Sequence, residues 1–175
     1  MIIDDEENIL KSLQRVLRVH KDWEVEVFTR GEDAIKRAKT SSFDLFLSDF
    51  RMPEMNGVEL LSTIRELQPD SMRFILSGYT DLDALLGAIN KANIFRFISK
   101  PWNESELLVS IEQALEIRDV IIENRMLADE VRLQKKELEN RKRAIDVFQS
   151  EHPALYDVNW GDDGSIILDK SLYKD

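Results

Sequence analysis

The chain has 175 residues, of which 43% are hydrophobic, and its formal net charge is −10 at pH 7. This length suits one domain of about 100 to 150 residues with an appendage. The lack of cysteine excludes disulfides and thiolate metal sites, and two histidines argue against a histidine-built zinc site. The acidic charge argues against binding to nucleic-acid phosphates, and no apolar stretch reaches the roughly 20 residues of a membrane span. We therefore expect a cytoplasmic protein that directly contacts neither nucleic acid nor a membrane.

Short apolar segments alternate with segments whose apolar residues recur every three or four positions. The predicted strands are Met1–Asp4, Trp23–Phe28, Leu45–Asp49, Arg73–Ser77 and Arg96–Ser99. The predicted helices are Glu7–Val19, Gly31–Lys39, Val58–Leu67 and Asp81–Ala92. The alternation predicts an α/β fold, a five-stranded parallel sheet with helices on both faces. Because the first strand begins at Met1 itself, we expect either a short strand or a natural start slightly upstream.

Polar residues stand at the carboxyl ends of four predicted strands: Asp4-Asp5, Asp49, Ser77 and Lys100. The carboxyl ends of parallel strands lie at one edge of a sheet, where chemistry collects in such folds. Converging carboxylates without His or Cys imply a hard cation, for which Mg²⁺ is the natural candidate. A carboxylate beside Mg²⁺ can attack a phosphoryl group, and an ammonium and a hydroxyl can stabilise the transferring oxygens.

A long helix is predicted to begin near Asn103, because no proline or glycine follows before Pro153. Its first part suits packing on the sheet, but from Ile117 the pattern becomes a heptad. Seven of the ten a and d positions are apolar, which favours a coiled coil. The residues assigned to its dimer interface are Ile117, Val120, Asn124, Leu127, Val131, Leu138, Ile145 and Phe148.

Two details favour a parallel homodimer over other uses of this helix. Asn124 at an a position is the kind of buried polar residue that fixes register. In a parallel pair, Glu130 would face Lys135 of the partner and Glu137 would face Lys142, opposite in sign. The alternatives are a helix that folds back on its own domain or packs on a domain absent from this chain.

The tail after Ser150 contains a glycine-bearing loop between two short apolar segments, 158–160 and 165–168. This pattern is typical of a hairpin, which is too small to be stable alone, so Trp160 must then pack on another surface. A disordered linker is the alternative. The predicted organisation is a domain at 1–116, a coiled-coil helix at 117–150 and a tail at 151–175.

The ordered set of polar residues resembles the receiver domain of response regulators in two-component signal transduction. The resemblance covers roughly residues 1–120 and includes Asp4-Asp5, Asp49 with Met52-Pro53 and Gly57 after it, Ser77-Gly78, and Phe97 before Lys100-Pro101. It implies a doubly wound, flavodoxin-like sheet with the strand order 2-1-3-4-5.

The resemblance implies that Asp49 is the phosphoacceptor, phosphorylated by a sensor histidine kinase or a histidine phosphotransfer protein. Asp5 and Asp49 would bind Mg²⁺ directly, together with the main-chain carbonyl of Arg51, and Asp4 would act largely through water.

The same resemblance implies that Ser77 and Lys100 hold the phosphoryl oxygens. It also implies that Ser77 and Phe97 form a conformational switch. It also implies a cis peptide bond before Pro101. Simpler roles stay open for some of these residues: Asp4 and the acid after it could cap a helix, Ser77 could begin a turn, and Phe97 could be a core residue.

The function implied is a non-enzymatic signalling module that passes phosphorylation to an unknown protein target through the dimeric helix. The alternative is a receiver fragment of a larger regulator whose effector enzyme follows residue 175, such as a cyclic-di-GMP phosphodiesterase, because Lys100-Pro101-Trp102 resembles such receivers. A phosphatase of the haloacid-dehalogenase kind would carry Asp-x-Asp on the first strand, which this chain lacks. A DNA-binding regulator would need a helix-turn-helix signal after Lys100, and none is visible.

Overall fold

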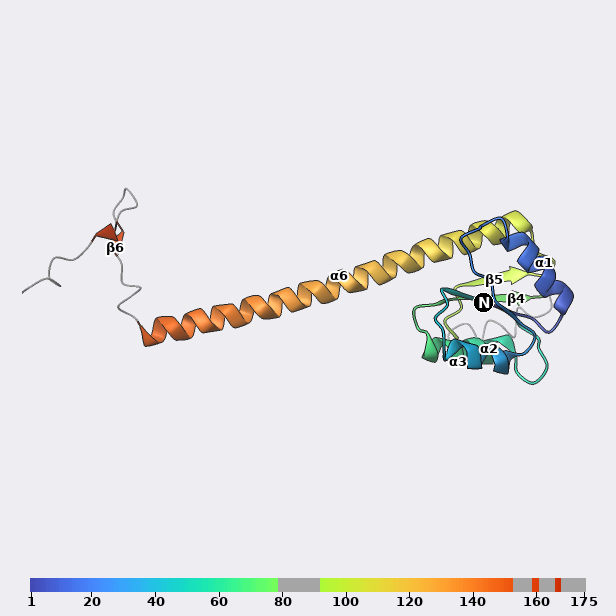
Figure 1. Ribbon diagram of the computed structural model, residues 1–175, viewed down its shortest axis with the longest axis horizontal. Coiled ribbons are helices and arrows are strands. Elements are labelled where there is room, and N and C mark those ends of the chain that lie inside the picture. The colour runs from blue at the N-terminus through green and yellow to red at the C-terminus, as the bar shows by residue number, and fades with distance from the viewer. Residues whose placement is uncertain (79–91, 153–158, 161–165, 168–175) are drawn as a thin grey trace, which may run out of the picture. The chain divides into compact units, whose positions relative to one another are not determined.

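The computed structural model of the protein describes residues 1–78, 92–152, 159–160 and 166–167 (Figure 1). The chain forms two compact units, Met1–Glu123 and Asn124–Asp175. The predicted helix Asp81–Ala92 lies, except for its last residue, outside the described residues.

The first unit is built on a five-stranded parallel sheet with the order β2-β1-β3-β4-β5. Its strands are β1 (Ile2–Ile3), β2 (Val27–Phe28), β3 (Leu45–Asp49), β4 (Met72–Ser77) and β5 (Arg96–Ser99). The flavodoxin-like fold predicted from the sequence is confirmed. Both β1 and β2 are shorter than predicted, and they pair at two positions, Ile2 with Val27 and Ile3 with Phe28.

Helices cover both faces of the sheet (Figure 1). They are α1 (Glu7–Leu17), α2 (Gly31–Ala38), α3 (Gly57–Leu67) and α6 (Glu104–Glu151). Side chains alternate between faces along a strand, so Ile3 and Phe46 join α2 and α3 in one core cluster, while Ile2 and Leu47 join α1 and the start of α6 in the other. The helix bounds agree with the predictions to within two residues at the ends compared.

Helix α6 begins as the sequence predicts. Asn103 Oδ1 accepts hydrogen bonds from the backbone N–H groups of Ser105 and Glu106, at 2.9 and 3.1 Å, which satisfies two of the free donors at the helix start. Within the first unit, Leu107, Ile111 and Ala114 are buried against the sheet. Three polar contacts flank this apolar contact: the ion pairs Arg15–Glu104 and Arg118–Asp44, both at 2.9 Å, and His20 Nε2, which lies 3.0 Å from Glu112 Oε1.

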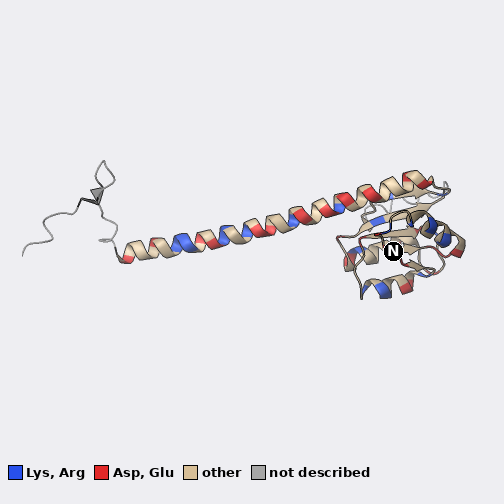
Figure 2. Ribbon diagram, turned by 45° about the horizontal axis from the view of Figure 1, so that its top comes forward, with Lys and Arg blue, Asp and Glu red and all other residues tan. Residues whose placement is uncertain are grey.

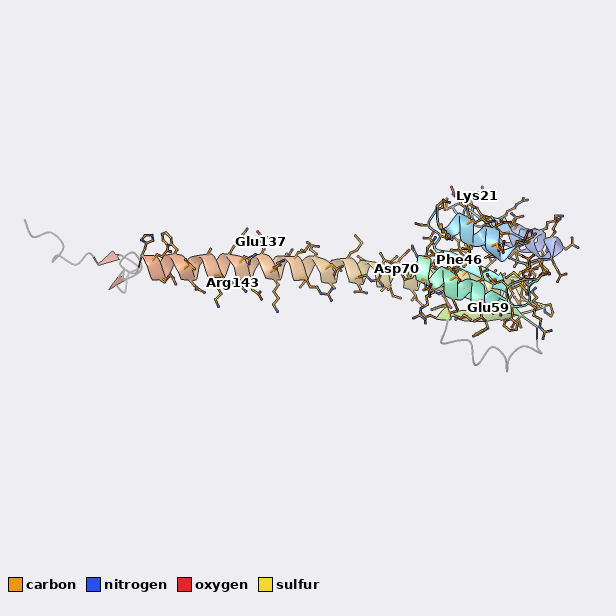
Figure 3. The ribbon with its side chains drawn as sticks, turned by 90° about the horizontal axis from the view of Figure 1, so that it is seen from below. Lys21, Phe46, Glu59, Asp70, Glu137 and Arg143 are labelled. Atoms are coloured by element: carbon orange, nitrogen blue, oxygen red, sulfur yellow. The ribbon has the colours of Figure 1, made fainter. Side chains whose placement is uncertain are left out.

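The second unit contains the remainder of α6 and two short strands. Acidic and basic residues are interleaved along α6 (Figure 2), and the side chains of Glu137 and Arg143 leave the helix on different sides (Figure 3). Helical neighbours form ion pairs, with Arg132–Asp129 at 2.6 Å and Arg141–Glu137 at 2.7 Å. Strands β6 (Asn159–Trp160) and β7 (Ile166–Ile167) pair antiparallel. In the parts of the chain that the structure describes, no helix is long and apolar enough to cross a membrane.

Candidate functional site

The carboxyl edge of the sheet brings together polar side chains from four strands or the residues that follow them. Lys100 Nζ lies 2.7 Å from Asp4 Oδ2 and 2.5 Å from Asp49 Oδ1. The backbone N–H of Lys100 donates to the Ser77 carbonyl at 2.8 Å, so the end of β4 lies beside Lys100. Asp4, Asp49 and Ser77 are buried, with exposed fractions of 0%, 6% and 5%. Sequence reasoning placed these residues at one edge, and the structure brings Asp4, Asp49 and Lys100 into direct contact.

The orientation of Asp49 depends on the loop that follows β3. The Arg51 N–H donates to Asp49 Oδ2 at 2.8 Å, and the Gly57 N–H donates to the Phe50 carbonyl at 2.9 Å. A Cβ atom at Gly57 would lie 2.1 Å from the Asp49 carbonyl oxygen, so only glycine permits this approach. Asn56 then begins α3 with a capping box. The loop therefore fixes both the backbone and the carboxylate of Asp49.

Two carboxylates at this edge share one ammonium. Burial raises the pKa of Asp4, while hydrogen bonds from Lys100 and from the Glu6 N–H oppose that rise. Burial opposes the charge on Lys100, but hydrogen bonds to Asp4 and Asp49 outweigh it and raise the pKa of the ammonium. These directions are consistent, because one cation between two carboxylates is strongly stabilised, whereas each carboxylate receives only part of its charge.

The donor set fits a hard cation that keeps several water molecules. With all three groups ionised, Asp4, Asp49 and Lys100 sum to −1, so a further positive charge would be favourable. Across the described ranges, no group of three or more His, Cys, Asp or Glu side chains could hold a metal ion by itself. Mg²⁺ commonly binds proteins through only one or two carboxylates and retains water. Asp5, next to Asp4, is exposed and therefore accessible to a hydrated ion.

Ser77 and Phe97, the residues predicted to form a conformational switch, lie on the neighbouring strands β4 and β5. Phe97 on β5 is half-buried and packs against the cluster that contains Phe46. It also lines a cavity of about 580 Å³ between β5 and the start of α6. The Lys100–Pro101 peptide bond is cis, in agreement with the sequence-based expectation. Trp102 packs against the opposite core cluster.

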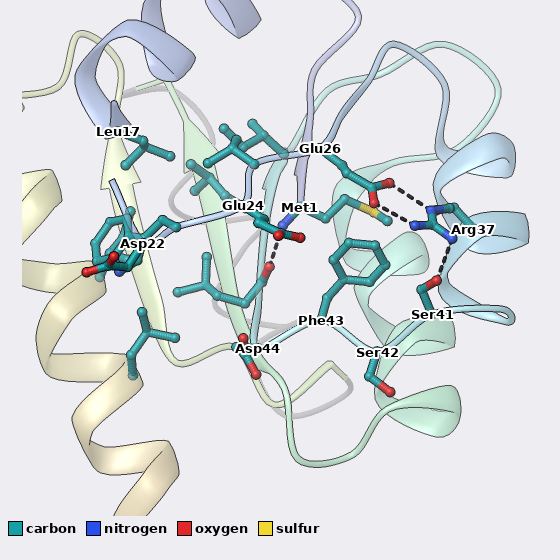
Figure 4. Close-up of a pocket in the computed structure, with 17 residues that line it drawn as sticks. Met1, Leu17, Asp22, Glu24, Glu26, Arg37, Ser41, Ser42, Phe43 and Asp44 are labelled. Carbon is teal, nitrogen blue, oxygen red and sulfur yellow. Dashed lines mark hydrogen bonds and ion pairs between the residues drawn. The ribbon is translucent and has the colours of Figure 1, made fainter. Parts of the chain in front are cut away.

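A cavity at the opposite edge of the sheet was not predicted from the sequence. It measures about 490 Å³, and the α-amino group of Met1 lies in its wall and donates to the Leu45 carbonyl at 2.8 Å (Figure 4). Burial lowers the pKa of this amine to about 5. On the rim, Arg37 forms an ion pair with Glu26 at 2.7 Å. No residue pattern predicts this cavity, because its walls come from several separate segments that meet only in the folded chain.

The fold and the carboxyl-edge cluster define a flavodoxin-like α/β domain with two carboxylates and an ammonium in contact at the edge of its sheet. The chain belongs to the response regulator receiver domain family: the family model described as response regulator receiver domain matches residues 1–112. The chain is thus a two-component receiver with a long C-terminal helix. Domains of this family generally bind Mg²⁺ at the phosphorylation site and interact with histidine kinases or phosphotransfer proteins.

Individual relatives support the family assignment. The hydrogenase transcriptional regulatory protein HoxA of Bradyrhizobium diazoefficiens is 35% identical over 117 residues, which cover 67% of this chain and 24% of that protein. The transcriptional regulatory protein FixJ of Rhizobium meliloti is 31% identical over 115 residues, covering 66% of this chain and 55% of that protein. The chain therefore spans about a quarter of HoxA and about half of FixJ.

Solved structures agree with the same fold. An uncharacterized protein from Neptuniibacter caesariensis has a TM-score of 0.67 and 36% identity, covering 71% of this chain and 91% of that one. The signal receiver domain of an HD domain-containing protein from Pseudomonas fluorescens has a TM-score of 0.66 and 33% identity, covering 70% and 89% respectively.

Proposed function

We propose that the protein is a phosphorylation-controlled switch whose phosphoacceptor is Asp49. The observation that carries this proposal is the contact of Lys100 with both Asp49 and Asp4 at the carboxyl edge. The donor is a phosphohistidine on a sensor histidine kinase or a histidine phosphotransfer protein. An Asp49 carboxylate oxygen attacks the phosphorus, the nitrogen–phosphorus bond breaks, and an aspartyl phosphate forms.

The remaining side chains act on the oxygens of the transferring group. Lys100 places its ammonium where negative charge develops, and the Ser77 hydroxyl donates a hydrogen bond to a phosphoryl oxygen. Mg²⁺, when bound by Asp5, Asp49 and the main-chain carbonyl of Arg51, supplies further charge neutralisation. Asp4 supports the ion largely through water and holds Lys100 in place.

The direct test is phosphorylation by acetyl phosphate in the presence of Mg²⁺, followed by intact mass. The native chain should gain one phosphoryl group and Asp49→Asn should gain none. Asp44→Asn is a matched control, because Asp44 is an exposed acid beside the opposite end of the same strand. Phosphorylation of Asp49→Asn to the native extent would show that the phosphoacceptor assignment is wrong.

We further propose that phosphorylation shifts the domain between two pre-existing states. The phosphoryl group draws in Ser77, and Phe97 on the neighbouring strand follows into the space that is vacated. Ser77→Ala should leave phosphorylation largely intact while weakening the change in the environment of Phe97. Nuclear magnetic resonance spectra with and without beryllofluoride measure that change; equal responses in the native chain and the variant would remove Ser77 from the switch.

We also propose that α6 forms a parallel, dimeric coiled coil. The large apolar side chains of its heptad are exposed, with fractions from 43% at Ile117 to 68% at Leu138. A largely apolar stripe on a helix favours association with another helix. Sedimentation equilibrium should give a dimer, and Val131→Lys should weaken it, whereas Lys136→Glu, outside the stripe, should not. A monomer with and without beryllofluoride and Mg²⁺ would contradict the dimer.

In this proposal the protein is cytoplasmic, has no substrate turnover of its own and acts on a downstream protein rather than on DNA. A second candidate is a receiver that belongs to a longer regulator with an effector enzyme after residue 175. Two observations favour this candidate: the matched residues make up only 24% of HoxA, and one similar structure is the signal receiver domain of an HD domain-containing protein. The mass of the native gene product distinguishes the two.

A further inference from the structure

The loop after Asp49 is fastened to the neighbouring loop at the same edge of the sheet. Arg30 precedes α2, and Glu54 lies in the segment between β3 and α3. Arg30 Nη2 donates to Glu54 Oε2 at 2.9 Å, so residues 24 positions apart form a direct ion pair. This pair joins the two loops that follow β2 and β3.

A second contact lies next to the ion pair. A Cβ atom on Gly31 would lie 3.4 Å from Met55 Sδ, so the first residue of α2 lies beside the Met55 side chain and leaves room for it. Met55 in turn packs against the core cluster beneath. Arg30 and Gly31 thus lie beside Glu54 and Met55: the ion pair joins the first two residues, and Met55 is held by the core cluster.

The backbone at Glu54 requires such a restraint. Its φ of 70° lies in the left-handed region, which is unfavourable for a residue that carries a Cβ atom. A strained conformation persists only where surrounding contacts determine it. The ion pair with Arg30 is one such contact, and the hydrogen bond from the Met55 N–H to the Pro53 carbonyl at 2.8 Å is another.

The same loop carries the groups that address Asp49. The Arg51 N–H holds Asp49 Oδ2, and the Arg51 carbonyl is a ligand in the proposed Mg²⁺ site. We propose that the Arg30–Glu54 pair is a positioning device for the reaction at Asp49: it holds the loop so that the amide and carbonyl of Arg51 both face the phosphorylation site. This inference rests on the proposed function.

The expected effect is modest, because the side chains of Arg30 and Glu54 are 55% and 59% exposed. Exposed ion pairs are weakened by water and salt. Arg30→Gln and Glu54→Gln should each raise the Kd for Mg²⁺ by about two- to fivefold at low salt. The double variant should be no worse than either single variant, and the difference from the native chain should largely disappear near 1 M salt.

Calorimetric titration with Mg²⁺ is the measurement, with initial phosphorylation rates from acetyl phosphate as a second readout. The matched control is Lys36→Gln, which removes the exposed Lys36–Asp33 pair of α2 without touching the loop. The exchange Arg30→Glu with Glu54→Arg should restore part of the lost affinity. Glu54→Gly should weaken Mg²⁺ binding like Glu54→Gln while raising the melting temperature, because glycine accepts the positive φ.

Unchanged affinity in both single variants, or effects that add in the double variant, would overturn the positioning role. Such a result is distinguishable from failure of the proposed function, in which the native chain itself neither binds Mg²⁺ nor accepts a phosphoryl group on Asp49.

Discussion

The two edges of the sheet accommodate buried charge in opposite ways. At the carboxyl edge, Asp4, Asp49 and Lys100 stay together as a network of ions. At the amino edge, the buried amine of Met1 has a pKa near 5 and is therefore neutral at pH 7, while the ion pairs around it lie on the exposed rim. At the carboxyl edge the charges are retained because they contact one another directly, whereas at the amino edge burial outweighs the attraction of Glu26 and Asp44 and the amine loses its proton.

The largest effect expected is a pH dependence that comes from the amino edge. In a chain whose first residue is Met1, the amine has a pKa of about 5 in the fold and 8.0 when unperturbed, so only the unfolded chain takes up this proton between those values. The free energy of unfolding should therefore fall as pH falls from 8 to 5, by up to about 4 kcal/mol. Urea unfolding across this range measures it. Adding two residues before Met1 replaces the amine with an amide and should remove this part of the slope.

A comparable loss is expected from Gly57→Ala at the carboxyl edge. The new Cβ would meet the Asp49 carbonyl oxygen at 2.1 Å, and backbone cannot move aside as a flexible side chain can. We expect the free energy of unfolding to fall by about 3 kcal/mol. Gly31→Ala is the comparison, since its neighbour is the end of the Met55 side chain at 3.4 Å. Equal losses in the two variants would refute the steric argument.

Removal of the shared cation should cost less. Lys100→Met leaves Asp4 and Asp49 buried without their ammonium; breaking a buried pair typically costs 3–5 kcal/mol, and the partial exposure of Lys100 reduces this to about 2 kcal/mol. Because the pKa of Asp4 is already raised, protonation relieves the unpaired charge, and the deficit should shrink as pH falls. Unfolding at pH 7 and pH 5 tests the sign; a deficit that grows on acidification would contradict it.

The smallest effect is expected at the rim of the amino edge. The Arg118–Asp44 pair joins a mostly buried guanidinium, 20% exposed, to a carboxylate that is 67% exposed. Water screens such a contact, so a double-mutant cycle of Arg118→Gln with Asp44→Asn should give a coupling below about 1 kcal/mol. A coupling free energy of about 2 kcal/mol, as large as the loss expected from Lys100→Met, would show that ion pairs stabilise both edges of the sheet equally.

Sequence reasoning predicted the carboxyl edge better than the amino edge. Strands β3 and β5 match their predicted bounds. For the central strand β3 the reason is its continuous apolar run, which is mostly buried in the sheet, whereas β5 is an edge strand of intermediate burial. The contacts among Asp4, Asp49 and Lys100 follow from parallel strands that end at a common edge. The buried amine of Met1 and the Arg30–Glu54 pair could not be predicted, because both depend on how separate loops and strand starts meet in space. A residue pattern does not predict such distances.

Strand β3 joins the two edges of the sheet in a mechanical sense. Asp44, directly before it, holds Arg118 of α6, and Asp49 at its end holds Lys100. An extended strand is already near its maximum length, so it cannot stretch to absorb a displacement. A movement of Asp49 along the strand axis would therefore also displace Asp44, whose exposed carboxylate contacts Arg118 of α6. The five residues of β3 therefore span the distance between the proposed phosphorylation site at Asp49 and the contact with α6 at Asp44.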